Sequence, residues 1–182
     1  MKRRHILVHL PLIATLPLLA GPARAATRRE IDAEVMSSLE TLRGMENARP
    51  LFANAHSVLV FPRILSGGFI VGGQYGEGAL VRGDAIQGYY RIAGASFGFL
   101  AGAQTAGIAM FFMNEAALTA LMAVDGWEIG TGPSVVALDQ GVQANVTTTT
   151  LREAVYSITF GQRGLMAALA LNGTKITRFQ PG

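Results

Sequence analysis

Residues 92–114 contain no charged side chain, and this stretch constrains the fold more than any other part of the sequence. One interpretation is a membrane-spanning helix, because glycine recurs at every fourth position from 94 to 102, as in closely packed membrane helices. The other is a pair of β-strands, because the residues from 94 to 103 alternate with period two. We favour two strands, since the alternation is regular and the polar pair Gln104-Thr105 interrupts the hydrophobicity.

The chain has 22 glycines and no cysteine. Several glycines fall within residues 72–78, but neither G-x-G-x-x-G nor G-x-x-x-x-G-K-[ST] occurs, so the sequence lacks these phosphate-binding loops. We interpret the stretch as a strand with small residues on one face, which lets another part of the backbone approach closely. The absence of cysteine excludes disulfides, thiolate zinc sites and cysteine nucleophiles.

Residues 1–25 have the pattern of a bacterial export signal. The positive residues Lys2, Arg3 and Arg4 precede an apolar run that is too short to span a bilayer, and Ala23-Arg24-Ala25 has the small-x-small pattern of a signal-peptidase site. We expect cleavage near Ala25, by the general secretory route or, given Arg3-Arg4, the twin-arginine route. The prediction is therefore a periplasmic or secreted protein.

Cleavage there changes the charge of the chain. Of the 15 basic residues, Lys2, Arg3, Arg4 and Arg24 leave with the signal, so that 11 remain against 12 acidic residues. The remaining arginines are scattered, whereas a nucleic-acid-binding domain needs clustered cations, so we expect no nucleic-acid partner. His56 is the one histidine after residue 25, and we expect it to be structural, since metal sites need several convergent ligands.

Two helices are predicted at the start of the expected mature chain. Residues 27–45 have apolar residues at the helical period, and Thr27 and Glu30 have the spacing of a capping box. Pro50 is placed to begin a second, short helix that extends to Ala55.

From residue 57 the sequence becomes rich in β-branched and aromatic residues. Predicted strands cover 58–61, stopped by Pro62, and then 69–81, 88–93, 134–138, 147–150, 156–160 and 174–179, while 165–171 is either a strand or a helix. Asn114 is placed to cap a short helix over 115–122. The order of elements predicts an α+β fold, with N-terminal helices packed on a curved, largely antiparallel, glycine-rich and barrel-like sheet. We expect a single domain over 26–182.

The segment Gly94-Ala95-Ser96-Phe97-Gly98 matches the G-x-S-x-G motif of serine hydrolases. That motif needs a strand-to-helix turn and a later histidine, and no histidine follows Ser96. The set His56, Asp84 and Ser96 has the chain order of a chymotrypsin-like triad, but the spacing is too compact for a double barrel. A serine hydrolase that uses Ser96 therefore remains a remote alternative, and we expect no enzyme activity.

Eleven short runs, in this order along the chain, resemble the SYLF domain family: 58–62 (VLVFP), 67–69 (GGF), 72–80 (GGQYGEGAL), 88–90 (GYY), 95–104 (ASFGFLAGAQ), 111–113 (FFM), 126–128 (GWE), 132–135 (GPSV), 147–150 (TTTT), 161–166 (GQRGLM) and 173–176 (GTKI). The resemblance implies a non-catalytic lipid-binding domain without a cofactor, acting at the cell envelope. The partner implied is a phospholipid or another amphiphile, with peripheral membrane contact. A protein-interaction or scaffold module without a lipid ligand is the alternative, and its protein partner is unknown.

Lipid contact in the family is attributed to a basic amphipathic segment at the N-terminal edge of the domain. The corresponding positions here are Arg28 and Arg29, beside the apolar residues Ile31 and Val35. The hypothesis is that such apolar side chains, or a cleft in the sheet, take up acyl surface. Arg28 and Arg29, or the further arginines Arg43 and Arg49, would then bind the phosphate.

Overall fold

The structure is a computed structural model that describes residues 26–68, 71–97, 102–123, 126–138, 151–163 and 173–182. The described helices are α1 (Arg28–Arg43), the 3-10 helix η1 (Glu46–Ala48), α2 (Arg49–Asn54) and α3 (Glu115–Leu121). The described strands are β1 (Ser57–Gly68), β2 (Val71–Arg82), β3 (Ala85–Phe97), β4 (Gly102–Phe112), β5 (Trp127–Glu128), β6 (Val135–Leu138), β7 (Val155–Arg163) and β8 (Lys175–Phe179). The three predicted helices are confirmed to within two residues at each end.

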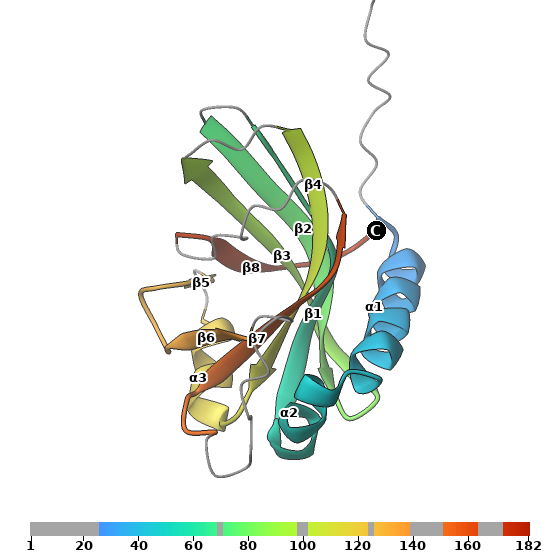
Figure 1. The fold of residues 1–182 in the computed structure, drawn as a ribbon, viewed down its shortest axis with the longest axis vertical. Helices are drawn as coiled ribbons and strands as arrows, with labels where there is room; N and C mark the ends of the chain where they lie inside the picture. The colour runs from blue at the N-terminus through green and yellow to red at the C-terminus, as the bar shows by residue number, and fades with distance from the viewer. Residues whose placement is uncertain (1–25, 69–70, 98–101, 124–125, 139–150, 164–172) are drawn as a thin grey trace, which may run out of the picture.

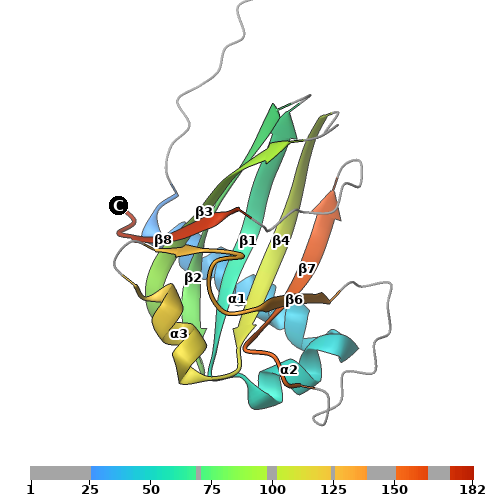
Figure 2. The same cartoon turned by 90° about the vertical axis from the view of Figure 1, so that its left-hand side faces the viewer.

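The described strands form one eight-stranded sheet in the order β5-β8-β3-β2-β1-β4-β7-β6. Every neighbouring pair is antiparallel except β6 and β7, which run parallel. The sheet curls strongly into a half-barrel, with α1 and α2 on one face and α3 on the other (Figures 1 and 2). The predicted α+β class with a curved, largely antiparallel sheet is therefore confirmed.

The two-strand interpretation of residues 92–114 is also confirmed. Residues 92–97 belong to β3 and residues 102–112 to β4, and 98–101 lie outside the described residues. The two strands do not pair with each other, because β2 and β1 lie between them. Among the residues that the structure describes, no helix is long and apolar enough to cross a membrane.

Pro62 does not end the first strand, which corrects the prediction of a strand over 58–61. β1 continues to Gly68, and its register shifts between Val60 and Arg63 against β2 and between Phe61 and Ile64 against β4. Proline has no N–H to donate to a ladder, but a bulge leaves one residue unpaired. The irregularity in both pairings therefore accommodates Pro62 within a long central strand.

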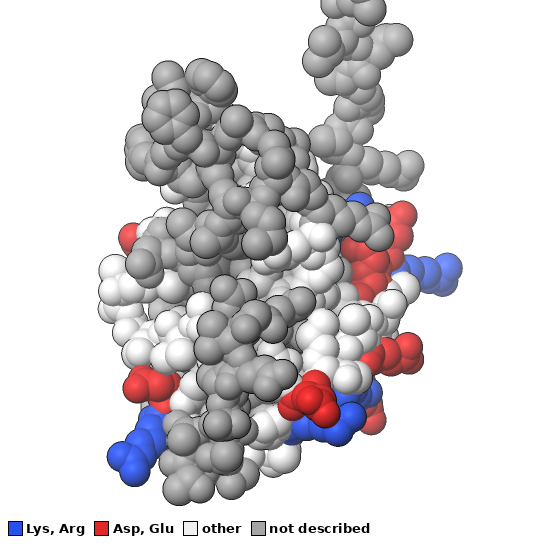
Figure 3. All heavy atoms as spheres, viewed as in Figure 1, with Lys and Arg blue, Asp and Glu red and all other residues white. Residues whose placement is uncertain are grey.

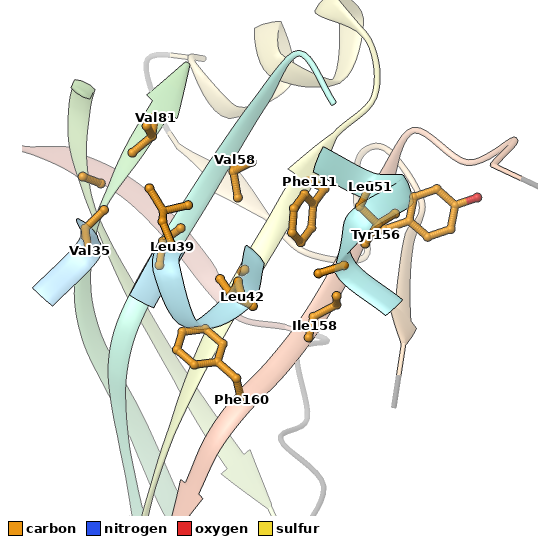
Figure 4. Packing of buried hydrophobic residues seen from close by; sticks show 14 of the residues in the cluster. Val35, Leu39, Leu42, Leu51, Val58, Val81, Phe111, Tyr156, Ile158 and Phe160 are labelled. Atoms are coloured by element: carbon orange, nitrogen blue, oxygen red, sulfur yellow. The ribbon is translucent and has the colours of Figure 1, made fainter. Parts of the chain in front are cut away.

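The helix α1 begins where the sequence predicts. The Thr27 side chain accepts a hydrogen bond from the Glu30 N–H, and the Glu30 carboxylate accepts one from the Thr27 N–H at 2.7 Å, which completes the capping box. The buried face of α1 packs on the sheet together with Leu51 of α2, against residues such as Val58, Val81 and Phe111 (Figure 4). We call this side of the sheet the α1 face.

The opposite side of the sheet buries a second apolar cluster, which includes Phe61, Tyr90 and Phe112 from the strands, Leu118 from α3 and Trp127 from β5. Because strand side chains alternate between the two faces, the central strands supply both clusters. Burial on both faces explains why β1 and β4 are almost continuously apolar in sequence.

Three predictions fall on segments outside the described residues: the export signal over 1–25, the strand over 147–150, and the strand or helix over 165–171. They stay predictions.

Candidate functional site

The four arginines predicted to bind phosphate do not meet at one place. Arg28 and Arg29 lie in the first turn of α1, whereas Arg43 lies in its last turn, roughly 22 Å away along the helix axis. Arg43 forms an ion pair with Asp84 at 3.0 Å, and Arg49 begins α2. The structure therefore separates the predicted cations into two groups.

Ile31 and Val35 are buried between α1 and the sheet, with exposed fractions of 2% and 0%. They belong to the same apolar cluster as Val58 and Val81 of the strands. In this conformation their side chains are not accessible to a lipid. Acyl contact through these two residues stays a prediction, and it requires α1 to leave the sheet.

Arg28 instead lines a pocket that an arginine from the other end of the chain also lines. This pocket, of about 270 Å³, opens between the start of α1, the strand β3 and the last strand, β8. Its lining consists of Arg28, Asp32, Ile86, Gln87, Gly88, Tyr89, Arg178, Phe179 and Gln180. Tyr89 pairs with Phe179 in the β3–β8 ladder, and both side chains lie on the α1 face. Arg178 pairs with Tyr90 and points to the other side of the sheet, where its guanidinium lies beside Gly88 at the edge of the pocket.

Among the described lining residues of this pocket, two arginines accompany one carboxylate, and beside it the Arg28 backbone N–H donates a hydrogen bond to a Gly182 oxygen at 3.2 Å. The Arg28 guanidinium lies over the Tyr89 ring, 5.2 Å from its centroid. The Tyr89 hydroxyl donates a hydrogen bond to Asp32 Oδ1 at 2.8 Å. Neither Arg28 nor Arg178 forms a salt bridge with a described residue.

Burial, and secondarily the hydrogen bond to Asp32, raises the pKa of Tyr89 above its usual value of 10.0. The phenol therefore stays protonated at neutral pH and holds the Asp32 carboxylate by its hydrogen bond. The Arg28 guanidinium is left as a donor for an anion on the α1 face, and Arg178 offers a second one at the edge of the pocket. Arginine suits phosphate because its planar group presents several N–H donors at once.

Sequence reasoning missed Arg178 because nothing near it in the chain indicates a binding role. It lies in a strand that was predicted over 174–179, and that strand is confirmed as β8. The information that was missing is the partner of that strand. Pairing of β8 with β3 joins residues about 90 positions apart, and no local pattern predicts it.

Elsewhere on the described surface, charges of both signs are interspersed. Arg63 pairs with Glu34 at 2.6 Å and Arg82 with Glu115 at 2.8 Å. In the view of Figure 3 the basic and acidic side chains alternate around the lower part and the right edge of the molecule. This face presents no continuous basic stripe of the kind that a nucleic acid requires.

The residues proposed for a serine-hydrolase triad are not brought together. Asp84 lies in the turn before β3 and pairs with Arg43, and Ser96 lies roughly 35 Å further along that strand. Ser96 pairs with Gly72 in a regular ladder, so it is not at a strand-to-helix turn. His56 Nδ1 lies 3.5 Å from Glu115 Oε2 instead. Among the described residues, no three His, Cys, Asp or Glu side chains gather to hold a metal ion.

Comparison with known proteins adds one match. Residues 93–180 match the family model Ysc84, described as Las17-binding protein actin regulator. The chain belongs to the Ysc84 (SYLF) domain family. No curated protein matches the chain. The SYLF match includes Arg178, Phe179 and Gln180 of the pocket, whereas Arg28 and Tyr89 precede it. The pocket therefore combines residues from the matched region with residues that precede it.

Proposed function

We propose that this SYLF protein is an exported, non-catalytic phospholipid-binding domain that acts at the cell envelope, and that the pocket at Arg28 and Arg178 binds the phosphate of the headgroup. The observation that carries the proposal is the presence of these two arginines in one pocket, without a salt-bridge partner among the described residues. A phosphodiester has one negative charge, which matches two guanidinium groups beside one carboxylate.

The size of the pocket supports a headgroup ligand rather than a whole lipid. A volume of about 270 Å³ is at the lower end of small-ligand pockets. It has room for a phosphate and its substituent but not for two acyl chains. The acyl chains then stay in the bilayer, and the protein binds the membrane peripherally.

The test is flotation with vesicles of phosphatidylcholine, alone or mixed with phosphatidylglycerol. The full chain is expressed with its own N-terminal segment and purified as the cell processes it. The double variant Arg28→Gln/Arg178→Gln removes both pocket cations. Arg49→Gln/Arg152→Gln is the matched control, because it removes the same charge from exposed positions outside the pocket.

We expect the pocket variant to lose about tenfold or more in vesicle affinity, since charge-assisted hydrogen bonds contribute about 1.5–3 kcal/mol each. The control variant should change little. Equal losses in both variants would mean that overall charge, not the pocket, attracts the membrane. If the wild-type protein floats with neither vesicle, lipid binding is wrong and the protein-interaction alternative replaces it.

Export is tested on the same material. We expect the chain recovered from the envelope fraction to begin near residue 26, as measured by intact-mass spectrometry. Recovery of the chain from the cytoplasm with residues 1–25 intact would contradict export.

A further inference from the structure

Two exposed apolar side chains lie next to each other on the α1 face. Leu65 of β1 and Tyr75 of β2 are direct partners in the β1–β2 ladder, with exposed fractions of 57% and 46%. They are two of the three large hydrophobic residues that are exposed in the described part of the chain, and Met122 is the third. Isolated exposed apolar residues are ordinary, but a directly paired Leu and Tyr form a patch.

The patch lies beyond the region of the sheet that α1 covers. Arg63 pairs with Glu34 of α1, and Leu65 lies two residues further on the same face of β1. Past the end of α1 the strands β1 to β4 continue well beyond the helix (Figures 1 and 2). No described helix therefore covers this end of the α1 face.

The strand positions on either side of the patch and beyond it carry small, uncharged side chains, and a pocket of about 630 Å³ opens beside it at Arg63 and Thr105. The neighbours of the patch across the sheet are Ala93 on β3 and Thr105 on β4. One row further along, the same face holds the partners Gly67, Gly73 and Ala95, none of which has a large side chain. In sequence, no charged residue occurs between Arg63 and Glu77 or between Arg91 and Glu115.

Charges of both signs border this area. Glu77 lies between Arg63 and Arg91 on one row and accepts a hydrogen bond from the Tyr75 hydroxyl at 2.6 Å, and Arg63 pairs with Glu34. Arg63 and Arg91 lie on the row next to Leu65 and Tyr75, and Lys175 pairs with Ala93 at the side of the patch. A tyrosine and a leucine bordered by Lys and Arg match the composition of a membrane interface, where aromatic rings lie at headgroup level and cations meet phosphates.

We propose that this end of the α1 face, centred on Leu65 and Tyr75, is the surface that rests on a lipid bilayer. The inference deepens the proposed function and rests on it, because a protein that binds only the headgroup must lie against the membrane.

The distance to the pocket is consistent with this arrangement. On β3, Ala93 of the patch lies four residues beyond Tyr89 of the pocket, about 13 Å along the strand and on the same face. With Leu65 and Tyr75 in the interface, Arg28 lies nearby on the same face, within reach of the phosphates.

The test separates the patch from the pocket with two probes. The double variant Leu65→Ser/Tyr75→Ser removes the patch, and Met122→Ser on α3 is the matched control, because Met122 is 55% exposed. The first probe is glycerophosphoglycerol, a headgroup without acyl chains, titrated by phosphorus NMR. The second is a vesicle of phosphatidylcholine and phosphatidylglycerol, measured by flotation. Thermal unfolding of each variant shows that it is folded.

We expect the patch variant to bind glycerophosphoglycerol like the wild type but to lose about tenfold in vesicle affinity, with Met122→Ser unchanged in both. Undiminished vesicle binding by the patch variant overturns the inference. If that variant also loses self-association, the patch binds a second copy of the chain instead. If the wild type binds vesicles but not glycerophosphoglycerol, the proposal of a headgroup pocket is wrong. A loss of vesicle affinity in the patch variant would still support the membrane-contact inference.

A second measurement does not depend on removing side chains. Two variants, Leu65→Trp and Met122→Trp, each add one exposed fluorophore. Their emission is compared with that of the wild type, in which the buried Trp127 is the one tryptophan. Vesicles should shift the emission of Leu65→Trp to shorter wavelength, and brominated lipids should quench it, while Met122→Trp is unaffected. Equal quenching of the two variants, or of neither, overturns the orientation.

Discussion

The close packing of β2 against β1 makes a sharp prediction at Gly78. A Cβ added there would lie 2.8 Å from the Val60 carbonyl carbon and 2.9 Å from Phe61 Cα, and it would overlap the Val60 carbonyl oxygen. These are backbone atoms of the bulged region of β1, so they cannot rotate away as a side chain can. The substitution Gly78→Ala must therefore displace the central strand itself.

The expected cost follows from overpacking. Insertion of one methyl group into a packed core costs about 1–3 kcal/mol, and we expect Gly78→Ala at the upper limit, about 3 kcal/mol, because the clash is with backbone. For a domain of this size, such a loss lowers the midpoint of thermal unfolding by roughly 6–12 °C. The control is Gly73→Ala on the same strand, where the nearest atom to an added Cβ is the Gly94 carbonyl oxygen at 3.8 Å.

The free energy of unfolding is measured by urea titration, with circular dichroism and the fluorescence of Trp127 as two probes. Gly73→Ala should be neutral or slightly stabilising, because alanine restricts the unfolded chain more than glycine does. A Gly78→Ala protein within about 1 kcal/mol of the wild type would refute the reasoning. Equal destabilisation by both substitutions would also refute it, because strand glycines would then matter for a reason other than close approach.

Three further perturbations test the packing, the cap and the buried phenols. The Leu42 side chain, on the buried face of α1, has an exposed fraction of 0%, so Leu42→Ala should lower the free energy of unfolding by about 3 kcal/mol. Glu40 is exposed on the same helix, and Glu40→Ala should change the free energy of unfolding little. Thr27→Ala removes the capping box and should cost about 1 kcal/mol in the same urea assay. Burial raises the pKa of Tyr90 above 10.0, so its contribution to stability is complete below about pH 10 and is lost as the pH rises through the folded-state pKa. In Tyr90→Phe, the free energy of unfolding should therefore decrease less above about pH 10 than in the wild type. An equal decrease in both proteins would mean that other groups cause it.

The helices could be predicted from the sequence because their signals are local. Thr27 and Glu30 are three residues apart and form the capping box that their spacing predicts. Asn114 likewise accepts a hydrogen bond from the Ala117 N–H at 2.9 Å and caps α3. The positions of most strands followed from β-branched runs and turns, such as the hairpin turn at Gly83, whose φ is +60°.

The candidate site could not be predicted in the same way, because it depends on which strands pair. Arg28 and Arg178 lie at opposite ends of the expected mature chain, and they share a pocket because β8 pairs with β3 beneath the start of α1. The error at Pro62 has a related cause. Proline usually ends a strand, and the bulge that accommodates it becomes visible only in the register with both neighbouring strands.

The burial of the apolar stripe on α1 also decides between two modes of lipid contact. Release of α1 to a membrane would transfer Ile31, Val35, Leu39 and Leu42 from the sheet to lipid, with little net change in their hydrophobic free energy. The sheet residues beneath them, among them Val58, Val81 and Phe111, would then be exposed to water, at roughly 1.5–3 kcal/mol for each large side chain.

Contact through Leu65 and Tyr75 incurs no such cost, because these side chains are already exposed in the folded protein. Any apolar surface that they bury in a bilayer is a net gain, and α1 stays in place to hold Arg28 in the pocket. The two arginines share their pocket only while α1 is packed on the sheet. The proposed headgroup site therefore favours membrane contact through the end of the sheet over contact through a released helix.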